Sequence, residues 1–228
     1  MQNVGAYGQE VSETIVSVRV YDRIENRAKE LSNADCGFAY RTSIFNTVEK
    51  NRYVVLAATF QLEQNGAPKI VYRDLREIFG EKLPTLHETR VAILKIRAAK
   101  SMVINAADPN SQSAGSFFKN PMVSRSQFSE IEKRAEKSGI ETIPYFETDE
   151  NYLKIPAAWL IEHSGFQKGY RSGNAGISTN HTLAIVNFGK ATAKEIIELK
   201  NEIQMQVKKI FDVELKPEPI FVGIKSDF

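Results

Sequence analysis

The sequence has 228 residues, of which 42% are hydrophobic and 25% are charged, an ordinary globular composition for one large domain or two small ones. Its 30 Lys and Arg residues nearly balance its 28 Asp and Glu residues and are mixed with them, which argues against nucleic acid or an anionic membrane as a partner. A single cysteine, Cys36, excludes an intrachain disulfide, and no apolar run reaches about 18 residues, so we expect a cytoplasmic protein without a membrane span.

The first part of the chain has the pattern of a β-sheet. β-branched and polar residues alternate from Ile15 to Val20, as in a half-buried strand, and residues 53–62 form a second strand-like run. A turn is predicted after this run, because Asn65 and Gly66 tolerate a positive φ.

Three helices are predicted by capping boxes, in which Ser or Thr is followed three residues later by Glu or Gln. The pairs are Thr85 with Glu88, Ser124 with Gln127, and Thr192 with Glu195. The first pair predicts a helix over residues 85–99. The last predicts an amphipathic helix over residues 192–211, because its apolar residues recur at three- and four-residue spacing.

The remaining elements are shorter. We expect a short helix after Pro156, a buried strand over residues 183–188 and an extended segment over residues 213–222. Residues 106–116 are rich in Ser, Asn and Asp and predict a long irregular loop, either a linker or part of an active site. Two groups of strands with helices between them predict an α+β fold rather than a regular βαβ repeat.

Generic catalytic signatures are absent from the sequence. The three histidines are scattered and there is one cysteine, so no metal site is predicted. The glycines of residues 169–176 match neither a dinucleotide-binding fingerprint nor a P-loop. Ser116 lacks the G-x-S-x-G pattern of a hydrolase elbow.

Four segments nevertheless carry more polar chemistry than a fold requires. They are Q-N-V-G-A-Y-G at residues 2–8, G-F-A-Y-R-T-S-I-F at 37–45, S-A-G-S-F-F-K-N-P at 113–121 and P-E-P at 217–219. Each has an ordinary explanation when taken alone. The first is then a plain turn, Arg41 a surface residue, Ser116 the cap of a turn before two core phenylalanines, and Glu218 an exposed carboxylate.

In this order, the four segments resemble the UDP-N-acetylenolpyruvoylglucosamine reductase family. The resemblance continues through A-A-W-L-I-E at residues 157–162 and S-T-N-H-T-L at 178–183, so it covers nearly the whole chain. It implies FAD-dependent reduction of UDP-N-acetylglucosamine enolpyruvate to UDP-N-acetylmuramate with NADPH, in peptidoglycan precursor synthesis. It also implies a monomer when the protein is full length.

The resemblance assigns roles to individual residues. Ser116 matches the serine that donates a proton, while Arg41 and Glu218 match residues that stabilise an enolic intermediate. The positions that match substrate-binding residues are Tyr72, Lys100, Asn120 and His181. The positions that match cofactor-binding residues are Gln2, Asn3, Gly5, Ala6, Tyr7, Gly8 and Tyr40.

The implied architecture has three parts. Residues 1–83 match the C-terminal part of a vanillyl-alcohol-oxidase-type FAD-binding domain, residues 84–190 an α/β substrate-binding domain, and residues 191–228 a helix with a return strand. In the family, a region that supplies much of the flavin site precedes the Q-N-V-G-A-Y-G motif. We therefore expect either a fragment or a start at an internal methionine.

Three functions remain open from the sequence. The first is the flavin reductase, and the presence of Arg41, Ser116 and Glu218 together favours it. The second is a catalytically incompetent fragment that keeps the UDP-sugar site but cannot hold flavin. The third, less favoured, is a sugar-nucleotide transferase that works without a redox cofactor.

Overall fold

The computed structural model describes residues 1–223, which form two compact units divided between Ile96 and Arg97. This division falls within helix α2 (Leu86–Ala99). The sequence predicted a domain limit after residue 83 and another after residue 190, and both limits remain predictions. Each unit is described by itself below.

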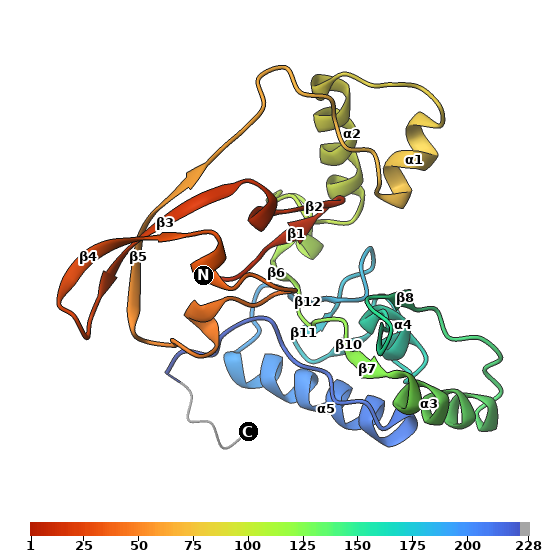
Figure 1. The fold of residues 1–228 in the computed structure, drawn as a ribbon. Helices are drawn as coiled ribbons and strands as arrows, with labels where there is room; N and C mark the ends of the chain where they lie inside the picture. Colours follow the sequence, from red (N-terminus) through yellow and green to blue (C-terminus); the bar gives the residue numbers. More distant parts are fainter. Residues whose placement is uncertain (224–228) are drawn as a thin grey trace. The chain divides into compact units, whose positions relative to one another are not determined.

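The first unit contains a three-stranded sheet, in which β3 (Ile15–Asp22) lies between β4 (Arg27–Ser32) and β5 (Tyr53–Phe60) (Figure 1). Its core face buries Ile15, Val18 and Val20 against Cys36. The two predicted strands are therefore confirmed. Strand β4 was missed because its sequence, R-A-K-E-L-S, is polar and largely exposed, and only its pairing with β3 makes it a strand.

A small hairpin precedes this sheet, formed by β1 (Gly5–Ala6) and β2 (Gln9–Glu10). Two helices follow the three-stranded sheet. Helix α1 (Arg73–Phe79) was not predicted from the sequence, whereas α2 confirms the helix predicted at residues 85–99. Helix α1 buries Leu75 against Ala92 and Ile96 of α2. Asn65 has a φ of +57°, as the predicted turn requires.

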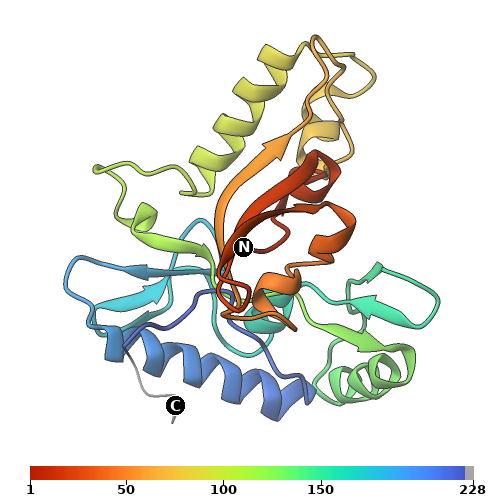
Figure 2. The ribbon, with the colours of Figure 1, turned by 60° about the vertical axis from the view of Figure 1, so that its left-hand side comes forward.

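The second unit is built on a four-stranded sheet in the order β10-β11-β12-β6. The strands are β6 (Ser113–Ser116), β10 (Arg171–Ser172), β11 (Ala175–Ile177) and β12 (Ala184–Asn187). Helix α5 (Ala193–Phe211) runs along this sheet and packs on β11 (Figure 2). Its apolar stripe, which includes Leu199, Ile203 and Val207, is buried as its spacing predicted.

A second, three-stranded sheet extends this unit. Its strands are β7 (Met122–Ser124), β8 (Phe146–Glu147) and β9 (Tyr152–Lys154), with β9 in the middle. Helix α3 (Arg125–Lys137) follows β7 and packs on α5, and α4 (Ala157–Glu162) follows β9. The capping boxes predicted at Ser124 and Thr192 are both formed.

The predicted irregular loop at residues 106–116 is wrong in its second half. It contains a 3₁₀ helix at Pro109–Ser111 and strand β6, whose small residues have little strand propensity of their own. Pairing with β12, which sets Ser116 opposite Ala184 and Ser113 opposite Val186, holds them extended. Other 3₁₀ helices span Val11–Glu13, Ala34–Cys36 and Ile44–Asn46.

Every strand pair in residues 1–223 is antiparallel, which agrees with the predicted α+β class. The vanillyl-alcohol-oxidase-type name for the first part and the α/β name for the substrate-binding part remain predictions. Residues 213–222 contain no helix, as predicted, and form one isolated bridge, between Pro217 and Phe118. Within the described chain, no helix combines the length and the apolar character that crossing a bilayer requires.

Candidate active site

The backbone of Phe117 joins three of the segments that the sequence singled out. Its N–H donates to the carbonyl oxygen of Leu183 at 2.8 Å, and its own carbonyl oxygen accepts from the N–H of Glu218 at 2.8 Å. The N–H of Lys119 donates to the carbonyl oxygen of Lys216 at 2.9 Å, so residues 117–119 and 216–218 are joined by two backbone hydrogen bonds. Ser116 and Glu218, 102 positions apart in the numbering, thus lie on neighbouring segments of the second unit.

Ser116 is the exposed last residue of β6, between a glycine with a positive φ and two buried phenylalanines. Gly115 has a φ of +77°, a left-handed conformation that favours glycine. On the other side, Phe117 and Phe118 are only 4% and 2% exposed, so they anchor the chain in the core. The hydroxyl of Ser116 is therefore exposed, while the backbone that carries it is fixed.

His181 lies in the turn that leads to Leu183. Its Nδ1 accepts a hydrogen bond from the N–H of Leu183 at 3.2 Å, which places the proton of the neutral ring on Nε2. Burial lowers the pKa of His181 below its ordinary value, and the charges of Lys100 and Lys168 lower it further. Two predicted substrate-binding residues, Lys100 and His181, therefore influence one another electrostatically.

Polar side chains join the loop after Lys100 to the turn that carries His181. Asn180 Nδ2 donates to Ser101 Oγ at 2.8 Å, and Asn110 Oδ1 accepts from the N–H of Thr179 at 2.9 Å. The hydroxyl of Ser101 is also the main cause of a lowered pKa at Asp108. Because Ser101 and Asn110 are buried, these bonds fix the spacing of the two loops.

The sequence analysis did not identify this set of polar residues. The Asp-Pro-Asn-Ser sequence at residues 108–111 is a turn signal that could have suggested an ordered loop. The partner of Asn110 in this turn is Thr179, which is 69 positions away, and the partner of Ser101 is Asn180, which is 79 positions away, so no local pattern connects them.

Asn120, another predicted substrate-binding residue, has a structural partner. Its Oδ1 accepts from the N–H of Ala157 at 2.9 Å, at the first residue of α4. The amide therefore caps a helix from a distant part of the chain. A substrate contact for Asn120 remains a prediction.

In the first unit, several predicted residues gather at the β1–β2 hairpin. Arg41 Nη2 donates to the carbonyl oxygen of Gly5 at 2.8 Å, and the Arg41 guanidinium carbon lies 5.3 Å from the centre of the Tyr40 ring. The rings of Tyr7 and Tyr72 meet edge to face, with centroids 5.1 Å apart. The motifs around residues 2–8 and 37–45, and Tyr72, are thus brought together within this unit.

Two predicted cofactor residues have internal explanations. Asn3 is 1% exposed, donates from Nδ2 to Glu10 and accepts from the N–H of Ser12. Gly8 has a φ of +85°, and a Cβ there would lie 2.2 Å from Cγ2 of Val71, so any larger residue would clash. Gln2, Gly5 and Tyr7 are partly exposed and Ala6 is exposed along the same hairpin. The cofactor role of all these residues remains a prediction.

Arg41 belongs to the first unit, whereas Ser116 and Glu218 belong to the second. The predicted convergence of all three side chains therefore remains a prediction, and the structure brings together the Ser116 and Glu218 segments.

Comparison with known proteins identifies the family of the chain. Residues 108–222, half of the chain, match the family model described as UDP-N-acetylenolpyruvoylglucosamine reductase, C-terminal domain. The chain belongs to the UDP-N-acetylenolpyruvoylglucosamine reductase family. The matched residues include Ser116, Asn120, His181 and Glu218, so the predicted residues of the second unit, apart from Lys100, fall within this conserved domain model.

Individual members of the reductase family align with almost the whole chain. The UDP-N-acetylenolpyruvoylglucosamine reductase of Thermobifida fusca is 44% identical over 98% of this chain and 64% of its own length. The reductase of Streptomyces coelicolor is 43% identical over 98% of this chain and 60% of its own length. The chain thus spans less than two thirds of these reductases.

A solved structure in the family shares the fold. The crystal structure of UDP-N-acetylenolpyruvylglucosamine reductase from Thermus caldophilus superposes with a TM-score of 0.54 at 24% sequence identity. The match covers 95% of this chain and 56% of that one. The likeness therefore extends through both units of the chain.

Proposed function

We propose that this chain contributes substrate-binding and proton-donating residues to an FAD- and NADPH-dependent reductase, which converts UDP-N-acetylglucosamine enolpyruvate to UDP-N-acetylmuramate in peptidoglycan precursor synthesis. The observation that carries the proposal is the hydrogen bond from the N–H of Glu218 to the carbonyl oxygen of Phe117. It sets the segment of Glu218 beside Ser116, within the part of the chain that matches the family model.

The β1–β2 hairpin offers residues that fit a flavin. Gly5 and Tyr7 are partly exposed, and Arg41 ties the neighbouring turn with Tyr40 to this hairpin. We assign Gly5, Ala6, Tyr7 and Tyr40 to flavin contact, because small residues let a ring approach the backbone and an aromatic ring can stack on it. The chemistry that FAD would supply when bound at these residues is hydride transfer to one carbon of the enolpyruvyl double bond, after reduction by NADPH.

Ser116 is assigned the matching proton transfer. When one carbon of the double bond gains hydride, the carbon beside the substrate carboxylate must gain a proton. The exposed Ser116 hydroxyl donates it: its O–H bond breaks, a C–H bond forms, and the oxygen recovers a proton from solvent. The buried Phe117 and Phe118 hold the backbone of Ser116 in place for this step.

Glu218 and Arg41 are assigned to the negative charge that develops on the substrate during this transfer. Pro217 and Pro219 fix their own backbone φ angles, and Pro219 also restricts the backbone of Glu218 to extended conformations. Lys100, His181, Asn120 and Tyr72 are assigned to the UDP-sugar, with Lys100 as a point charge for the diphosphate. The lowered pKa of His181 favours the neutral form of its ring.

The proposal is tested by the colour and redox behaviour of the purified protein. We expect yellow protein whose flavin absorbance is bleached by NADPH and restored by the enolpyruvyl substrate. Colourless protein that still binds the UDP-sugar would favour the catalytically incompetent alternative. Turnover of a UDP-sugar without any redox cofactor would favour a transferase.

A further inference from the structure

The segment that carries Glu218, residues 215–221, makes contacts on two sides. On one side it is bonded to residues 117–119, as described above. On the other side, Gln204 Nε2 donates to the carbonyl oxygen of Leu215 at 2.7 Å, and Lys200 Nζ lies 5.6 Å from the centre of the Phe221 ring. Lys200 and Gln204 are four positions apart on α5 and therefore share one face of the helix.

Lys200 is an unusual residue for a buried helix face. It is 6% exposed, and burial lowers its pKa below the ordinary value. In residues 1–223, no carboxylate lies within ion-pair distance of its ammonium group. Since a buried charge costs free energy, a methionine would satisfy the packing better, and the lysine calls for another explanation. The ring of Phe221 supplies a π face for the ammonium.

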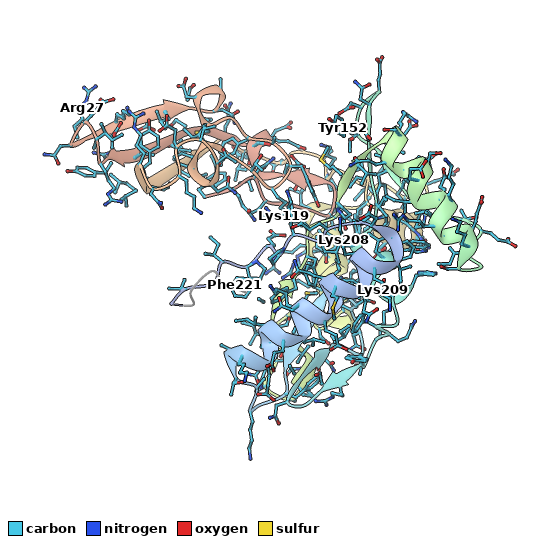
Figure 3. All side chains as sticks on the ribbon, turned by 90° about the horizontal axis from the view of Figure 1, so that it is seen from below. Arg27, Lys119, Tyr152, Lys208, Lys209 and Phe221 are labelled. Atoms are coloured by element: carbon cyan, nitrogen blue, oxygen red, sulfur yellow. The ribbon has the colours of Figure 1, made fainter. Side chains whose placement is uncertain are left out.

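Phe221 also contacts the other side of the site. Its ring centroid lies 6.3 Å from that of Phe117, at an interplanar angle of 55°. Phe221 is 37% exposed, whereas its neighbours Ile220 and Val222 are 85% and 86% exposed, so Phe221 is the inward-facing residue of the three. Figure 3 shows Phe221 beside α5, with Lys208 and Lys209 further along the same helix.

We propose that Lys200, Gln204 and Phe221 are positioning residues, which hold Glu218 beside Ser116 and Phe117. The inference rests on the proposed function, because it takes Ser116 and Glu218 as reactive residues. Pro217 and Pro219 stiffen the segment, so its placement depends on the anchors at its two ends. Gln204 holds the end at Leu215, and Lys200 with Phe221 holds the other end.

Hydrogen exchange on this chain tests, without any cofactor, whether Phe221 holds the segment that carries Glu218. In Phe221→Ala, the backbone amide of Glu218, which bonds the carbonyl oxygen of Phe117, should exchange about tenfold faster, because the segment opens more often, while the amides of α5 keep their protection. Val222→Ala is the matched control, since it truncates an exposed side chain of the same segment. Unchanged exchange in Phe221→Ala would overturn the proposal, and so would equal loss of protection in α5.

Stopped-flow kinetics of the flavin-loaded protein test the consequence for catalysis. In Lys200→Met, reduction of flavin by NADPH should keep its rate, while reoxidation by the enolpyruvyl substrate should slow about three- to tenfold. The melting temperature should not fall, because a buried charge has been removed. Lys209→Met, an exposed lysine on the same helix, is the matched control, and Phe221→Tyr should restore the rate lost in Phe221→Ala.

The two proposals fail in different ways. If Ser116→Ala leaves reoxidation unchanged, the proposed function is wrong, whatever the anchor variants do. If Ser116→Ala slows reoxidation but Lys200→Met and Phe221→Ala do not, the positioning role alone is refuted. Protein that binds no flavin would refute the proposed function. Hydrogen exchange would then still decide whether Phe221 holds the segment that carries Glu218.

Discussion

The side-chain oxygen of Asn120 accepts a hydrogen bond from the backbone N–H of Ala157, at 2.9 Å. Ala157 is the first residue of α4, and Pro156 before it has no side chain that could cap the helix. A residue 37 positions away therefore supplies the acceptor that the local sequence lacks. Asn120 also belongs to the segment of Ser116, so the same amide links the start of α4 to the candidate site.

Replacing Asn120 separates its structural role from its predicted contact with substrate. Asn120→Ala should lower the free energy of unfolding by about 1 kcal/mol, the usual cost of losing a cap. Asn120→Asp keeps the acceptor and should stay close to wild type in urea denaturation, while its added negative charge weakens binding of the UDP-sugar. Equal affinity of Asn120→Asp and wild type in calorimetry would argue against substrate contact.

Ser116→Ala should separate the two half-reactions. Reduction of flavin by NADPH needs no proton from Ser116 and should keep its rate. Reoxidation by the enolpyruvyl substrate should slow by about 10²–10⁴, the usual contribution of a positioned acid. Single-turnover absorbance measurements give both rates, and Ser113→Ala on the same strand serves as the control. Equal loss of both rates would refute the role assigned to Ser116.

His181 and His163 should be opposite tautomers. His181 Nδ1 accepts from the N–H of Leu183, whereas His163 Nδ1 lies 2.8 Å from the carbonyl oxygen of Trp159 and must carry the proton. Long-range proton–nitrogen NMR spectra at pH 7.5 distinguish the two forms. A proton on Nδ1 of His181 would contradict its hydrogen bond with Leu183, and a proton on Nε2 of His163 would contradict its bond with Trp159.

Titration of the same NMR signals tests the environment of His181. Its midpoint should lie below the ordinary value of 6.5, because burial and the charges of Lys100 and Lys168 disfavour the imidazolium. Lys100→Met should raise this midpoint towards 6.5, whereas Lys137→Met, an exposed lysine at the end of α3, should leave it unchanged. Since the folded pKa is depressed, any stability that the neutral ring supplies is lost as the pH falls below 6.5. A midpoint that does not respond to Lys100→Met would contradict the proximity of these residues.

Asp22 should make the first unit sensitive to acid. Its carboxylate is fully buried and bonded to Arg52 Nη2 at 2.8 Å and to Lys29 Nζ at 2.7 Å, and Arg52 is the main cause of its strongly lowered pKa. The stability that it supplies is present above its unfolded pKa of 3.8 and is lost as the pH falls towards the folded value.

The measurement for Asp22 is urea denaturation at pH 7 and at pH 3. Asp22→Asn should lower the midpoint at pH 7 more than Glu49→Gln, because Asp22 is buried among two cations and Glu49 is partly exposed beside one. The difference between wild type and Asp22→Asn should shrink at pH 3. If the difference in urea midpoint between wild type and Asp22→Asn stays constant over this pH range, the ionised carboxylate of Asp22 does not account for its contribution to stability.

The sequence by itself determined the elements that local chemistry controls. The capping residues Ser124 and Thr192 predicted where α3 and α5 begin, because their side chains bond amides three residues away. The alternation from Ile15 to Val20 predicted β3 and its buried face for a similarly local reason. Six ordered motifs also sufficed to recognise the family that the comparisons identify.

Only the tertiary structure decided the features that depend on residues far apart in the chain. Strands β4 and β6 have weak strand propensity and become strands through pairing with β3 and β12. The proximity of the Ser116 and Glu218 segments depends on a backbone hydrogen bond across about one hundred positions, and the partner of Asn120 lies in another element. Such contacts form because a folded chain must satisfy buried N–H and C=O groups, and which group finds which partner is fixed only when the core has packed.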